Sequence, residues 1–76
     1  MPDLVLSYED EMRLLYYEPG MTQMVPDFEI ISWMKDQGYV YDKDWFCRLA
    51  DDNGHNPYVL FFPNAEIMSA FLIRWL

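Results

Sequence analysis

The densest group of polar side chains in the sequence is the run Asp-Asp-Asn-Gly-His-Asn at positions 51–56. It superficially resembles a calcium-binding loop, but placing Gly54 at the sixth loop position puts Leu49 at the first, where calcium needs an oxygen ligand. We therefore interpret the run as a solvated hairpin turn. His55 has no serine or cysteine nucleophile beside it, so we interpret it as a surface histidine rather than a general base.

The remaining reactive residue types do not form a catalytic group. Cys47 alternates with Phe46 and Arg48 in an apolar stretch, which predicts a buried structural thiol. One cysteine and one histidine cannot hold a structural zinc ion without carboxylates, and three scattered glycines cannot form a phosphate-binding loop. We expect the neighbouring carboxylates Asp42 and Asp44 to be solvated. The sequence thus predicts no enzyme, no catalytic residue, no metal and no cofactor.

Acidic residues dominate the charge of the chain. Asp and Glu number 13 and Lys and Arg number 5, and the net charge of −8 argues against direct binding of nucleic acid. Such a charge is typical of a soluble surface, or of a surface complementary to a basic partner, with carboxylates that mimic phosphates. Both interpretations stay open. The candidate carboxylates are Glu9, Asp10, Glu11, Glu18, Asp36, Asp42, Asp44, Asp51 and Asp52.

The length and the composition predict one compact domain over residues 1–76. With 53% hydrophobic and 18% aromatic residues, the chain has the composition of a folded domain rather than a disordered tail. No apolar run approaches the ~20 residues of a membrane span, so we expect no contact with a membrane. The acidic start Met1-Pro2-Asp3 predicts no signal peptide.

Two helices have clear end signals. The first is predicted over residues 26–37, with Pro26 at the first helical position and Gly38 just past the end. Its apolar face would combine Phe28, Ile31 and Met34, and Ile30 and Trp33 would widen it. The second is predicted over residues 65–75, with Asn64 as the N-cap.

Residues 44–62 predict a β-hairpin whose turn is Asn53-Gly54. Alternation then assigns each residue to one of two faces of the sheet. The first face would hold three cross-strand pairs: Trp45 with Phe62, Cys47 with Leu60, and Leu49 with Tyr58. The second face would hold Phe46, Arg48, Val59 and Phe61.

The N-terminal part has two possible structures. The aromatic and apolar residues at 12–17 favour a strand, and a helix over residues 8–17 is the alternative. The strand gives an α+β fold of order β-α-β-β-α, with a small mainly antiparallel sheet and two helices on one face, a truncated ferredoxin-like arrangement. The hairpin's second strand would be central. One sheet edge would lack a partner, and either Leu4-Val5-Leu6 or a second copy would cover it.

The aromatic residues exceed what one small core holds. We assign Trp33, Trp45, Phe71 and Trp75 to the core. The surplus predicts an aromatic interface. Its members would be Phe46, Phe61, Tyr16, Tyr17, Tyr39 and Tyr41, with Arg48 beside the two phenylalanines.

The end of the chain resembles that of many small uncharacterised tailed-phage proteins. In both, an aromatic strand, here Tyr58-Val59-Leu60-Phe61-Phe62, leads into an acidic helix start and a Phe-x-x-Arg-Trp ending. Phe71, Arg74 and Trp75 match that ending, whereas Leu72-Ile73 replaces the usual Lys-Leu. The resemblance implies a phage accessory protein that manipulates its host, and it carries over no catalytic residue.

These features predict a small acidic accessory protein of the host cytoplasm. It would bind and inhibit or redirect a host protein with a basic surface, such as a nucleic-acid-handling or defence factor. The alternative is a homodimeric self-association module with no inhibitory role.

Overall fold

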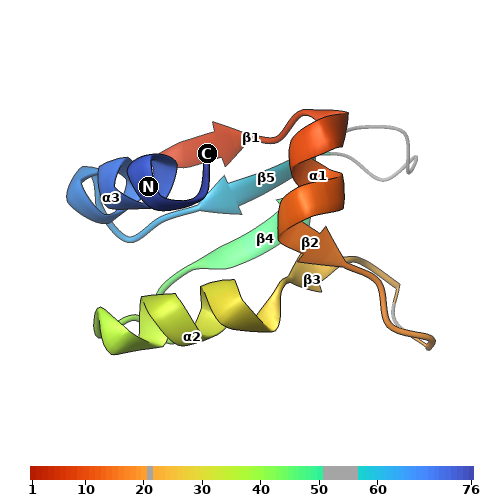
Figure 1. Ribbon diagram of the computed structural model, residues 1–76, viewed down its shortest axis with the longest axis horizontal. Helices are drawn as coiled ribbons and strands as arrows, with labels where there is room; N and C mark the ends of the chain where they lie inside the picture. The colour runs from red at the N-terminus through yellow and green to blue at the C-terminus, as the bar shows by residue number, and fades with distance from the viewer. Residues whose placement is uncertain (21, 51–56) are drawn as a thin grey trace.

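The computed structural model describes residues 1–20, 22–50 and 57–76, and this part of the chain contains one three-stranded sheet (Figure 1). Its strands are β1 (Asp3–Val5), β4 (Phe46–Leu49) and β5 (Tyr58–Phe61). They lie in the order β1-β5-β4, and both outer strands run antiparallel to β5. The most apolar strand therefore takes the central place, as predicted.

The predicted register of the β4–β5 hairpin is confirmed. The pairs are Phe46–Phe61, Cys47–Leu60, Arg48–Val59 and Leu49–Tyr58. Cys47 and Leu60 are buried against the helices, whereas the next pair along, Phe46 and Phe61, stays partly exposed. The predicted turn Asn53-Gly54 lies outside the described residues. So do three candidate polar residues: Asp51, Asp52 and His55.

The segment after β1 is helical, and the strand favoured over residues 12–17 is wrong for most of its length. The Ser7 hydroxyl accepts a hydrogen bond from the Asp10 amide at 3.2 Å, and the Asp10 carboxylate accepts one from the Ser7 amide. This capping box stabilises the first turn of α1 (Tyr8–Leu14). Only β2 (Leu15–Tyr16) is extended, and it pairs with β3 (Val25–Pro26).

The predicted order of five elements is consequently incomplete. The first strand of the main sheet is β1, which pairs along β5 and is drawn from the apolar run suggested as an edge cover. Helix α1 and the β2–β3 pair are inserted before the next helix (Figure 1). The predicted class, an α+β fold with antiparallel pairing, is confirmed.

Helix α2 (Phe28–Asp36) begins two residues later than predicted. Pro26 belongs to β3, and Asp27 is the N-cap, whose carboxylate accepts a hydrogen bond from the Glu29 amide at 3.1 Å. Gly38 follows the end of the helix as predicted. Its φ of +95° is a left-handed conformation that suits glycine, since a Cβ would be strained there.

Phe28 does not join the buried face of α2, contrary to the prediction. The buried residues of the helix are Ile30 and Met34, one turn apart. Phe28 lies two residues before Ile30 and so points to the opposite side of the helix. Its side chain is 74% exposed.

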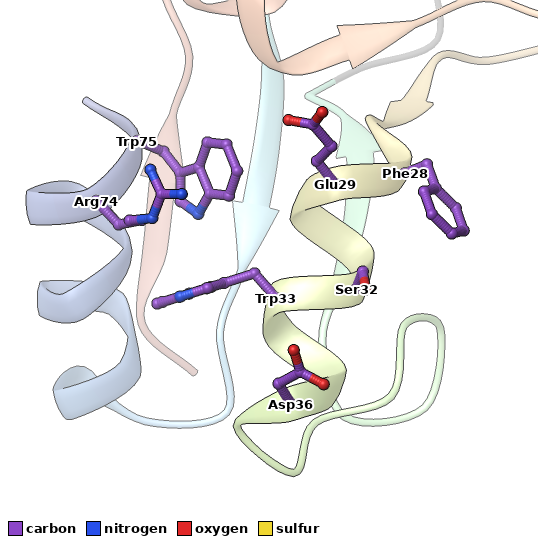
Figure 2. Close-up of a pocket in the computed structure, with 7 residues that line it drawn as sticks. All are labelled: Phe28, Glu29, Ser32, Trp33, Asp36, Arg74 and Trp75. Carbon is purple, nitrogen blue, oxygen red and sulfur yellow. The ribbon is translucent and has the colours of Figure 1, made fainter.

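Helix α3 (Ala65–Trp75) has the predicted bounds, and the Asn64 side chain caps it by accepting a hydrogen bond from the Ile67 amide at 2.9 Å. Figure 2 shows α2 and α3 side by side in front of the sheet. Between them and the sheet, Phe71 packs on Phe62 with ring centres 5.1 Å apart, and both rings are fully buried. The helices therefore cover one face of the sheet.

Candidate binding surfaces

The sheet face opposite α2 and α3 carries the two phenylalanines predicted for an interface. Phe46 and Phe61 pair across β4 and β5, with ring centres 5.0 Å apart and ring planes tilted by 31°. Both side chains remain partly exposed. We call this surface the open sheet face. By strand register it comprises Asp3, Val5, Phe46, Arg48, Phe61 and the buried Val59.

Arg48 connects the aromatic pair to an acidic residue. Its guanidinium carbon lies 4.8 Å from the centre of the Phe46 ring, and its Nη2 lies 3.4 Å from Oδ1 of Asp42. Asp42 precedes β4 in a turn and has a φ of 70°, a left-handed conformation that aspartate tolerates better than most residues. Four predicted binding residues thus form one continuous surface: Phe46, Phe61, Arg48 and Asp42.

Asp3 also belongs to this surface, although it is not among the carboxylates predicted from the sequence. It pairs with Phe61 across β1 and β5, and directly paired residues share one face of a sheet. Alternation around Leu4 is the signal that would have found it. The predicted candidate Asp44 has a local role, because its Oδ2 accepts a hydrogen bond from the Val40 amide at 2.8 Å and closes the turn before β4.

The acidic run Glu9-Asp10-Glu11 lies at the other end of the sheet from Asp42. The Leu6 amide, just before α1, donates a hydrogen bond to the Tyr58 carbonyl at 2.9 Å, and Tyr58 lies at the far end of the hairpin. The four residues of β4, about 10–13 Å, separate the two ends. Asp10 is engaged in the capping box, and partial burial raises the pKa of Glu11. The described carboxylates therefore do not converge into one row.

The remaining aromatic candidates divide into two groups. Tyr16 and Tyr17 are exposed at 42% and 59%, but they lie in and just after β2, away from the open sheet face. Tyr39 and Tyr41 pack against the core instead, where Tyr41 meets Trp45 edge to face at 4.9 Å. Burial also raises the pKa of the Tyr41 hydroxyl. The last two tyrosines are thus part of the packing rather than surplus.

A second surface feature is a groove of about 300 Å³ between α2 and α3, which we call the α2–α3 groove (Figure 2). Trp33 and Trp75 were assigned to the core, but they are only partly buried and form walls of this groove. Their rings meet edge to face with centres 6.3 Å apart. The Arg74 guanidinium carbon lies 4.6 Å from the Trp75 ring centre. The sequence missed the groove because its two walls come from separate helices.

The described residues include one thiol, that of Cys47. Cys47 is buried as predicted, and burial raises the pKa of its thiol to about 12, so the thiol stays neutral and is a poor nucleophile. In residues 1–20, 22–50 and 57–76, no three His, Cys, Asp or Glu side chains gather as a metal site would require. None of the described helices has the length and apolar character needed to span a membrane.

Comparison with known proteins adds no identification. No family model matches the chain, and none of the curated proteins or solved structures compared with it is significantly similar.

Proposed function

We propose that the protein is a small acidic binding protein, without enzymatic activity, that docks a basic protein partner on its open sheet face. The observation that carries the proposal is the Phe46–Phe61 pair, which stays partly exposed while the opposite face of the sheet is covered by helices. Contiguous apolar surface of this kind marks interaction sites, and a few aromatic and arginine residues dominate the binding energy of interfaces. Arg48, stacked on Phe46, adds such a residue.

The charge of the chain supports a cationic partner. A net charge of −8 attracts a basic surface over distances of about the Debye length, which increases the rate of encounter. Asp3 and Asp42 lie beside the aromatic pair and would meet cations at the rim of the contact. Because the described carboxylates lie at both ends of the sheet, we assign charge to steering, and the aromatic pair to the contact itself.

The resemblance to tailed-phage accessory proteins supports a partner from the host cell. In this proposal the protein acts in the host cytoplasm, where it inhibits or redirects a protein that handles nucleic acid or serves in defence. Such proteins present basic surfaces to phosphate, and an acidic domain competes for the same surfaces.

A homodimer is the second candidate, favoured by the position of β4. In the described part of the chain β4 pairs only with β5, so its outer edge is available to a second copy. Light scattering at micromolar concentration separates the candidates. A dimer in solution would support self-association, whereas a monomer would leave the partner-binding proposal.

The experiment that tests the main proposal begins with capture of partners from bacterial lysate at about 50 mM and about 500 mM salt. The captured protein is then purified, and its affinity is measured for two double variants. Phe46→Ser/Phe61→Ser removes the aromatic pair. Tyr16→Ser/Tyr17→Ser is the matched control, because it removes two exposed aromatic rings from another surface.

The open-face variant should bind at least about tenfold more weakly, since hot-spot aromatic residues contribute about 2 kcal/mol or more. The tyrosine variant should stay within about twofold of the unmodified protein, and high salt should weaken binding of all three forms. Equal losses in the two variants would contradict the assignment of the open sheet face.

A further inference from the structure

We infer that the α2–α3 groove binds an arginine side chain presented by a protein ligand. The groove lies on the helical side of the molecule, opposite the open sheet face (Figure 2). The groove and the open sheet face share no residues, so substitutions can test each site without altering the other. The inference does not depend on the function proposed above.

The walls of the groove are aromatic and held in place. Trp33 meets Phe71, a fully buried core residue, edge to face at 6.5 Å. Trp75 lies in the last turn of α3, and its carbonyl accepts a hydrogen bond from Nη2 of Arg13 at 3.0 Å. That bond ties the end of α3 to α1. The two indoles therefore offer fixed, partly exposed ring surface to a ligand.

The rim of the groove carries two carboxylates on one side. Glu29 and Asp36 are seven residues apart on α2, which places them on the same side of the helix, two turns or about 10 Å apart. Trp33 lies between them, as Figure 2 shows. Among the described residues, neither carboxylate has a hydrogen-bond or ion-pair partner. A cation seated over Trp33 would reach a carboxylate on either side.

Arginine fits this arrangement better than other cations. A planar guanidinium can stack on an indole while its edge donates hydrogen bonds to a carboxylate, whereas a lysine ammonium is a compact, strongly hydrated charge. The chain already shows such stacking, because Arg74 lies 4.6 Å from the Trp75 ring centre. Phe28 also lines the groove, but its ring points away from Trp33 and Trp75 (Figure 2).

The size and charge of the groove argue against other occupants. A volume of about 300 Å³ is at the lower end of the range for small-molecule pockets and suits a side chain with a short stretch of backbone. Glu29 and Asp36 would repel the phosphates of a nucleotide. Among the described residues that line the groove, Arg74 is the one cation on the α3 wall, and its guanidinium is stacked on Trp75 rather than placed between the carboxylates.

The test is a titration of the isotope-labelled protein with a short capped peptide of alternating arginine and alanine, followed through the indole N–H signals. The signals of Trp33 and Trp75 should move, and that of Trp45, which is fully buried, should not. A lysine peptide of the same length should bind more weakly. Unmoved groove indoles, or equal affinity for the two peptides, would overturn the assignment.

Two double variants make the test specific for the groove. Glu29→Gln/Asp36→Asn removes both rim charges and should weaken binding of the arginine peptide roughly five- to tenfold. Glu18→Gln/Glu66→Gln removes two exposed charges elsewhere, and Glu66, like Glu29, lies in the first turn of a helix. This control should change the affinity less than about twofold. Equal losses in affinity for the two double variants would show general charge attraction and overturn the groove assignment. That result would not bear on the proposal for the Phe46–Phe61 surface.

Discussion

Phe61 and Phe62 are adjacent in the chain but belong to opposite sides of the sheet, so they form a matched pair for mutation. Phe62 is fully buried among the helices, whereas Phe61 stays partly exposed beside Phe46. If the open sheet face is a binding surface rather than part of the hydrophobic core, replacing Phe61 by alanine should lower the free energy of unfolding far less than replacing Phe62.

The magnitudes follow from burial. A buried phenylalanine replaced by alanine costs about 3–5 kcal/mol in the free energy of unfolding, including the cavity that remains. Replacing Phe61 by alanine removes a smaller buried area, because the ring is partly exposed. It also removes the contact with Phe46, and an aromatic pair contributes about 0.5–1.5 kcal/mol. We therefore expect the free energy of unfolding to fall by about 1–2 kcal/mol in total. The whole domain of 76 residues has a stability of roughly 4–11 kcal/mol.

Urea denaturation followed by tryptophan fluorescence measures both variants. Because Phe62→Ala removes a large share of the total stability, Phe61→Leu and Phe62→Leu serve as a milder pair, for which we expect less than about 0.5 and about 1–1.5 kcal/mol. Equal destabilisation at the two positions would refute the account, since it would mean that Phe61 is core.

Two further predictions concern the capping box and the buried thiol. Ser7→Ala should lower the free energy of unfolding by about 1 kcal/mol through loss of the α1 cap, measured by urea denaturation, and an unchanged value would contradict the capping role. Burial raises the pKa of Cys47 to about 12 from an ordinary value of 9.0, so the unfolded chain loses this proton first. The stability that the neutral Cys47 thiol contributes should be fully present below pH 9. Above pH 9 the free energy of unfolding should fall by up to about 1.4 kcal/mol per pH unit. Cys47→Ala should flatten the slope between pH 9 and 10, before Tyr41 contributes, and a slope that persists would exclude Cys47 as its source.

The elements that the sequence predicts well are those fixed by short-range signals. Alternation over Phe46–Leu49 and Tyr58–Phe61 gives the correct hairpin register, because a shift by one residue would expose the core face. Asn64 marks the start of α3 because its side chain alone satisfies a free amide at the helix terminus, and this is also a short-range signal. The Phe46–Phe61 pair follows from the same alternation.

The N-terminal part shows where local propensity misleads. Aromatic and apolar residues at 12–17 favour a strand, but the Ser7–Asp10 capping box starts a helix whose last residue, Leu14, enters the core. That capping pair is present in the sequence and is the stronger signal. The short β2–β3 pairing is not visible locally, because it depends on contacts between segments separated by a loop.

The α2–α3 groove depends on tertiary packing and is therefore beyond sequence patterns. Helix α2 starts at Phe28 rather than Pro26, and its buried side is defined by Ile30 and Met34. That orientation leaves Phe28 exposed at the groove. Only the packing of α3 against this side brings Trp75 to Trp33.

The most direct measurement of the central claim is the footprint of the partner on the isotope-labelled protein. The backbone amide signals are recorded with and without the partner purified by capture. If the partner docks on the open sheet face, the shifts should be concentrated at Val5, Phe46, Arg48, Val59 and Phe61, with Tyr16 and Tyr17 unaffected. Shifts confined to other surfaces would contradict it.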